Sequence, residues 1–140
     1  MIFEAPTEWI SPESFPDLKD HKYIAIDLET KDPGLKARGS GALIGDGEIV
    51  GVAVAVEGWS GYYSFGHKEG NFFDEAVVMR WVKEICALPN VKLFHNAMYD
   101  VCWLRAYGVQ INGHIIDTMV MASLVDENRF HYSLNSLSID

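Results

Sequence analysis

The chain has 140 residues, a formal net charge of −9 and 49% hydrophobic residues. This hydrophobic content excludes a disordered chain, and the length fits one domain. No apolar run approaches the ~18 residues of a membrane span, and no basic stretch precedes an apolar block at the N-terminus, as it would in a secretory signal peptide.

The acidic balance restricts the expected partners. With 11 Lys and Arg residues against 20 Asp and Glu residues, the chain is not expected to grip a long nucleic acid unaided, because such proteins normally present a basic face. An acidic balance suits divalent cations, and equally an ordinary solvated surface. Two cysteines, Cys86 and Cys102, make no disulfide framework, which favours a reducing, cytoplasmic compartment.

The first half of the chain predicts an extended leader and three strands. Residues 1–20 are rich in proline near the start and show no helical or alternating period. Short β-rich runs predict strands over 22–30, 48–58 and 60–66, the last two forming an antiparallel hairpin. Five glycines and a proline predict a long loop over 31–47.

The second half alternates helices and strands. A helix is expected over about 72–87, with Asn71 and Asp74 supplying capping chemistry, before a strand over 91–94. The aromatic residues around the third predicted strand and in this helix are expected to pack in the core or on the sheet; these are Trp59, Tyr62, Tyr63, Phe65, Phe72, Phe73 and Trp81. This order of elements indicates a mixed α/β sheet.

Three further elements follow. Asn96 is expected to cap a helix over 97–107 that Gly108 ends, a short strand follows at 115–116, and a helix runs from 117 to about 125. Another helix is expected to start at residue 133. Because the chain stops about two turns later, we expect the domain to be incomplete at its C-terminal end.

Two acidic residues end the first predicted strand. Asp27 and Glu29 are at positions i and i+2, so their carboxylates lie on the same face. Two such charges repel unless a cation or proton intervenes, and Mg²⁺ is commonly held by one or two carboxylates. The alternative is a solvated strand end that carries two surface acids.

A second polar group follows the fourth strand. If this strand lies beside the first, Asp100 on the next helix can reach Asp27 and Glu29. Its alternative role is to stabilise the helix N-terminus through the helix dipole. His95 is either part of this group or a hydrogen-bonded histidine at a strand end.

Three segments carry a family resemblance. IAIDLET, FHNAMYDVCWL and IIDTMVMASLV resemble the first two motifs and the following Asp-Thr helix of the DEDD superfamily of 3′–5′ exonucleases. The greatest likeness is to the proofreading domain of family A, phage-type DNA polymerases, over about residues 20–140. The resemblance implies a ribonuclease H-like sheet of five strands in the order 3-2-1-4-5, with strand two antiparallel and helices on both faces.

The resemblance also implies a site. Asp27, Glu29 and Asp100 match catalytic acids that bind two Mg²⁺ or Mn²⁺ ions and hydrolyse the terminal phosphodiester at the 3′ end of single-stranded DNA. Substrate-binding positions match four residues, which are Thr30, Leu35, Asn96 and Tyr99. Asp117 resembles an Asp that is usually structural.

The superfamily also has a fourth acid, preceded by Tyr or His, and this sequence has no match for it. Residues 21–140 are therefore expected to form an incomplete exonuclease-like domain. A missing C-terminal segment, in the same or another chain, is expected to complete it, and a polymerase domain is expected as a partner. The chain alone is expected to be weak or inactive. Alternatives are an RNA exonuclease similar to ribonuclease D and a non-catalytic scaffold. A cytoplasmic location, in a bacterium or a phage-infected host, is expected.

Overall fold

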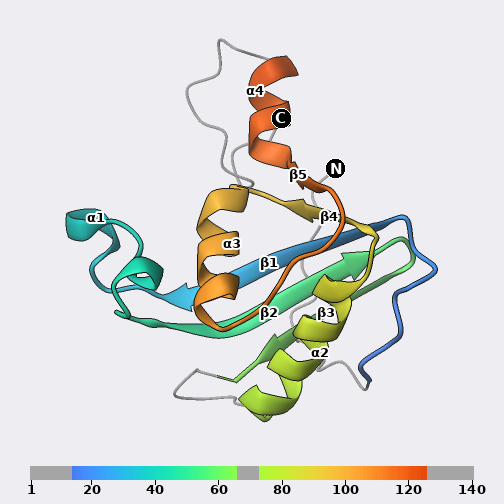
Figure 1. The fold of residues 1–140 in the computed structure, drawn as a ribbon, viewed down its shortest axis with the longest axis horizontal. Coiled ribbons are helices and arrows are strands. Elements are labelled where there is room, and N and C mark those ends of the chain that lie inside the picture. Colours follow the sequence, from blue (N-terminus) through green and yellow to red (C-terminus); the bar gives the residue numbers. More distant parts are fainter. Residues whose placement is uncertain (1–13, 66–72, 126–140) are drawn as a thin grey trace, which may run out of the picture.

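A five-stranded sheet forms the centre of the protein. The computed structural model describes residues 14–65 and 73–125 (Figure 1). The strands are β1 Tyr23–Lys31, β2 Glu48–Val56, β3 Trp59–Ser64, β4 Val91–Phe94 and β5 Ile115–Asp117. Their order is β3-β2-β1-β4-β5, with β2 antiparallel to both neighbours and β4 parallel to β1 and β5. The predicted strand order and the antiparallel second strand are confirmed.

The helices begin and end close to the predicted residues, with two differences. They are α1 Leu35–Arg38, the 3₁₀ turn η1 Gly41–Leu43, α2 Glu75–Ala87, α3 Ala97–Ala106 and α4 Thr118–Val125. The segment predicted as a loop therefore contains α1 and η1. Helix α2 starts at residue 75 instead of 72, because the Asp74 side chain accepts hydrogen bonds from the backbone N–H groups of Ala76 and Val77.

The core lies on one face of the sheet. Along β1, Ile24, Ile26 and Leu28 are buried, and they pack with apolar side chains of α2 and α3. Figure 1 shows both helices over the same side of the strands. This pair of helices therefore covers one face of the sheet. The reason is that β3–α2–β4 and β4–α3–β5 are successive right-handed crossovers in one direction across the sheet.

An aromatic cluster closes the β3 side of the core. Tyr63 stacks on Phe15, with ring centroids 4.8 Å apart, and lies 5.0 Å from Trp81. The Trp81 indole donates a hydrogen bond to the Pro16 carbonyl at 3.1 Å, and Leu18 is 1% exposed. The part of the leader from residue 14 therefore packs against the domain, and the expected packing role holds for Tyr63 and Trp81.

Helix α3 begins differently from the prediction. Asn96 occupies the N-cap position with a left-handed backbone (φ 66°), but its side chain makes no capping hydrogen bond. Instead, the Asp117 carboxylate accepts hydrogen bonds from the backbone N–H groups of Asn96 and Ala97, and also from Met119 at the start of α4. One carboxylate thus joins the starts of two helices. Burial alone would raise the pKa of Asp117, yet these donors lower it overall.

Some predictions concern residues that the structure does not describe. The first 13 residues, the proposed cap at Asn71 and the expected helix from Ser133 lie outside the described residues. Gly108 follows α3 with φ +76°, as expected for a residue that ends a helix. Among helices in the described ranges, none has the length and apolar character needed to cross a membrane.

Candidate active site

Asp27 and Glu29 lie on the sheet face opposite the core. They alternate along β1 with Ile26 and Leu28, which face α2 and α3, so both carboxylates are directed to the other side and are exposed. Partial burial is the main cause that raises the pKa of Asp27. The nearby charge of Glu29 raises it further, and His95 lowers it. The two acids therefore form a like-charged pair at the end of the strand.

Asp100 is the buried acid of the group. It lies in the first turn of α3 and is 4% exposed. Burial, and then the charge of Asp27, raises its pKa to about 7, while a hydrogen bond from the Leu28 backbone N–H acts in the opposite direction. Its second carboxylate oxygen, Oδ2, is buried and has no hydrogen-bond partner among the described residues. Such an unsatisfied oxygen is costly, and a cation or a proton would offset that cost.

The acids interact electrostatically in pairs, Asp27 with Glu29 and Asp27 with Asp100, but they do not form a set of metal ligands in this structure. Across residues 14–65 and 73–125, no three His, Cys, Asp or Glu side chains lie close enough together to hold a metal ion. The donor chemistry nevertheless fits a hard divalent cation, because carboxylate oxygens are the ligands that Mg²⁺ prefers. Asp27 and Asp100 interact electrostatically, and Asp100 Oδ2 lacks a partner. These are the residues that could hold such an ion.

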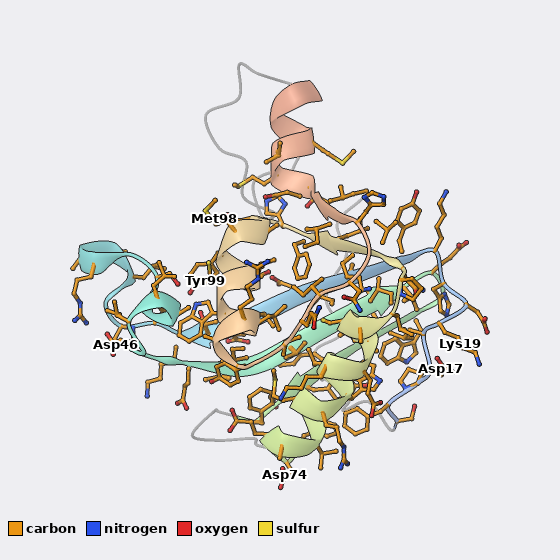
Figure 2. The ribbon with its side chains drawn as sticks, viewed as in Figure 1. Asp17, Lys19, Asp46, Asp74, Met98 and Tyr99 are labelled. Atoms are coloured by element: carbon orange, nitrogen blue, oxygen red, sulfur yellow. The ribbon has the colours of Figure 1, made fainter. Side chains whose placement is uncertain are left out.

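Thr30 and Tyr99 meet in a hydrogen-bond network. The Tyr99 hydroxyl donates to Asp32 Oδ2 at 3.0 Å and therefore accepts from Thr30 Oγ1 at 2.7 Å. Asp32 Oδ1 in turn accepts from the Gly41 backbone N–H at 3.0 Å. Figure 2 shows Tyr99 on the side of α3 that faces the segment carrying η1. The network ties α3 to the end of β1. Sequence reasoning missed Asp32, although an Asp before Pro-Gly is typical of a turn anchor.

The other two predicted substrate residues lie at the surface. Leu35 is on α1 and is 43% exposed, and Asn96 is exposed just before α3. Met98, which is 79% exposed, lies beside Tyr99 in the first turn of α3 (Figure 2). Leu43 and Ile44 are also exposed apolar residues in the segment between β1 and β2. Apolar side chains are thus available to solvent on the two segments that the Tyr99 network joins.

His95 has a structural partner. Its Nδ1 lies 2.9 Å from Thr118 Oγ1, and the Thr118 hydroxyl also donates to the Phe94 carbonyl at 3.2 Å. This is the hydrogen-bonded histidine at a strand end that the sequence offered as one of two roles. Its charge also lowers the pKa of Asp27, so it still affects the acidic pair.

Tyr62 is a residue of this site that sequence reasoning placed in the packing. Its hydroxyl donates a hydrogen bond to Glu29 Oε2. Burial raises the pKa of Tyr62, as do the hydrogen bond to Glu29 and the charge of that residue. The sequence could have indicated this role, because successive side chains of a strand alternate between its two faces. Tyr62 and the buried Tyr63 must therefore lie on opposite faces of the sheet.

This chain is similar to known exonuclease and DNA polymerase sequences over most of its length. A family profile described as 3′–5′ exonuclease matches residues 7–138. Similar proteins include a DNA-directed DNA polymerase of Pseudomonas phage M6, 26% identical over 94% of this chain and 21% of the relative. The DNA polymerase DpoZ of Salmonella phage PMBT28 is 28% identical over 89% of this chain and 18% of its own length. The chain thus spans about a fifth of these relatives.

Two solved structures share the fold. A structure of the POL domain of Pol1 from M. smegmatis in complex with DNA primer-template and dNTP has a TM-score of 0.60 and 14% identity over 86% of this chain and 19% of that one. The EXO domain of Aedes aegypti Nibbler has a TM-score of 0.51 and 14% identity, over 81% and 51% of the two chains.

Proposed function

Because the chain belongs to the 3′–5′ exonuclease domain family, we propose that it removes nucleotides from the 3′ end of single-stranded DNA as the proofreading part of a phage DNA polymerase. Residues 21–140 form this domain after the leader, and a polymerase domain is its partner. We place it in the cytoplasm of a phage-infected bacterium. The observation that carries the proposal is the buried Asp100 carboxylate, which is coupled to Asp27 and has an oxygen without a partner.

Asp27, Glu29 and Asp100 are the residues that would hold Mg²⁺ or Mn²⁺, and their side chains would have to move closer together to share an ion, because no three such groups of the described residues are close enough in this structure. Two divalent ions, when bound, supply positive charge that offsets the negative charge of the reacting phosphate. The burial of Asp100 makes its carboxylate a strong ligand, because little water competes for it. The exposed positions of Asp27 and Glu29 leave the opposite side of the site open to substrate.

The substrate end would be held by the rim of the site. The bonds to Thr30 and Asp32 fix the Tyr99 ring at the end of β1, where it would orient the terminal nucleotide. Exposed Leu35 and Met98 can contact base faces, which suits binding without base readout. The net charge of −9 is consistent with binding of only a few nucleotides, because long nucleic acids are bound by positively charged surfaces.

The two alternatives are less well supported. The phage DNA polymerase relatives favour DNA over the RNA substrate of a ribonuclease D-like enzyme. A scaffold has no need for a buried carboxylate with an unsatisfied oxygen, which costs free energy of folding.

The 140-residue chain alone is expected to digest DNA slowly or not at all, because it supplies three acids of the four that the DEDD pattern requires. The assay uses 5′-labelled single-stranded DNA and RNA of one sequence with Mg²⁺ or Mn²⁺. A version extended to include the fourth acid is expected to shorten the DNA from its 3′ end. Rapid digestion by the chain itself would show that three acids suffice. Digestion of RNA alone would favour the ribonuclease D-like alternative, and an inactive extended domain would contradict the function.

A further inference from the structure

Tyr62 reaches Glu29 across an intervening strand. Strand β2 lies between β1 and β3, yet the Tyr62 hydroxyl donates to Glu29 Oε2. The strand register explains why Tyr62 points toward the acids. Asp27 is paired with Ala53 on β2, and Ala53 is paired with Tyr62 on β3. Paired residues share a face, so the phenol lies on the same side of the sheet as both acids.

A glycine makes room for this contact. Gly51 is the β2 residue paired with Glu29, and it interrupts an otherwise β-branched and alanine-rich strand. A Cβ at this position would lie 2.3 Å from the Tyr62 hydroxyl oxygen and 2.7 Å from the ring carbon that carries it. Cβ atoms essentially never lie this close to another heavy atom, so a side chain at position 51 would force the Tyr62 phenol to move. Glycine inside a strand weakens the strand, and close approach of another group is one of the reasons it occurs there.

Packing alone does not explain Tyr62. Its neighbour Tyr63 is 0% exposed within the aromatic cluster and donates its hydroxyl hydrogen bond to the Ser14 carbonyl at 2.5 Å. Tyr62 is only partly buried, lies on the opposite face and uses its hydroxyl on a carboxylate. Two adjacent tyrosines therefore have different roles.

We propose that Tyr62 is a positioning residue that holds the Glu29 carboxylate in one orientation beside Asp27, where it binds a divalent cation, and that Gly51 admits the phenol to this position. The proposal rests on the proposed function. Hydrogen bonds to ligating carboxylates orient the ligand, and their removal typically weakens metal affinity by about 10- to 100-fold. Without the phenol, the Glu29 carboxylate would lose a hydrogen bond that favours its observed orientation, and fewer Glu29 conformations would be competent to bind.

The test is a calorimetric Mn²⁺ titration of the full 140-residue chain and its variants. Tyr62→Phe is expected to weaken Mn²⁺ affinity by about 10-fold while preserving the ring and the melting temperature to within a few degrees. Gly51→Ala is expected to cause a similar loss because the new methyl group displaces the phenol. The double variant should bind no more weakly than the weaker single variant, since both changes remove one interaction. Tyr63→Phe, which removes a hydroxyl on the other face, is the matched control and should retain the parent affinity.

The outcomes separate the two proposals. If the unmodified chain binds no Mn²⁺, the proposed metal site fails and this inference fails with it. If the unmodified chain binds Mn²⁺ and Tyr62→Phe binds it equally well, the positioning role alone is overturned. Strictly additive losses in the double variant would also overturn it, because they would show that Gly51 acts independently of the phenol. In the extended domain, a higher Mn²⁺ concentration should restore cleavage by Tyr62→Phe.

Discussion

Replacement of Asp27 or Asp100 by alanine in the extended domain is expected to lower kcat by about 10²- to 10³-fold, since loss of one preorganised group that stabilises developing charge has effects of this order. Each change removes a carboxylate proposed to hold the divalent ions. Both variants are expected to remain folded, because removal of one acid relieves its repulsion with the other. The measurement is single-turnover cleavage of a 5′-labelled strand, with circular dichroism to verify the fold.

Asp17→Ala is the matched control for these variants. Its side chain is exposed, and Figure 2 shows it on the opposite side of the molecule from Tyr99. The control should cleave at the unmodified rate. If Asp27→Ala and Asp100→Ala instead lose much of their thermal stability, the acids are structural. If they keep full activity, the assignment of catalytic acids is wrong.

The stability of the chain without divalent ions is expected to fall as the pH rises from about 4 to 7. Asp100 has a folded pKa of about 7, against 3.8 as its ordinary value. The folded state therefore binds more protons than the unfolded state in this range, and the free energy of unfolding decreases with pH. A difference of about three pKa units corresponds to at most about 4 kcal/mol. The side chain is 4% exposed, so solvent screens little of this effect.

Asp100→Asn should remove most of this pH dependence, because the amide does not ionise. At pH 8 we expect the variant to be more stable than the unmodified chain by a few kcal/mol. The measurement is urea unfolding from pH 4 to 8 in EDTA, with Asp17→Asn as a control that keeps the original slope. Asp27 has a raised pKa and adds to the slope, and Asp117 has a lowered pKa and opposes it, but both residues are present in all three proteins. Parallel stability curves for Asp100→Asn and the unmodified chain would contradict a raised pKa.

Local sequence patterns were sufficient to predict most of the sheet. Short apolar, β-rich runs located β1, β2 and β4 within two residues, because buried strands need such side chains. The short elements α1 and η1 escaped prediction. They depend on contacts such as that between Asp32 and the Gly41 N–H, which joins residues nine positions apart in an otherwise glycine-rich segment.

The site was predictable only where its geometry follows from strand adjacency. Parallel pairing of β1 with β4 brings Asp100 near Asp27, and a strand order inferred from the family resemblance contains this pairing. Two other features depend on long-range contacts that no local pattern encodes. Asp117 replaces the Asn96 side chain as the cap of α3, and Tyr62 crosses β2 above Gly51 to reach Glu29.

The most direct test of a shared cation site is carboxyl ¹³C NMR of the chain during a Mg²⁺ titration. We predict that the resonances of Asp27, Glu29 and Asp100 shift together with one midpoint, while that of Asp17 stays constant. Shifts of Asp27 and Glu29 without any response from Asp100, or no saturable response from the three, would contradict a common site.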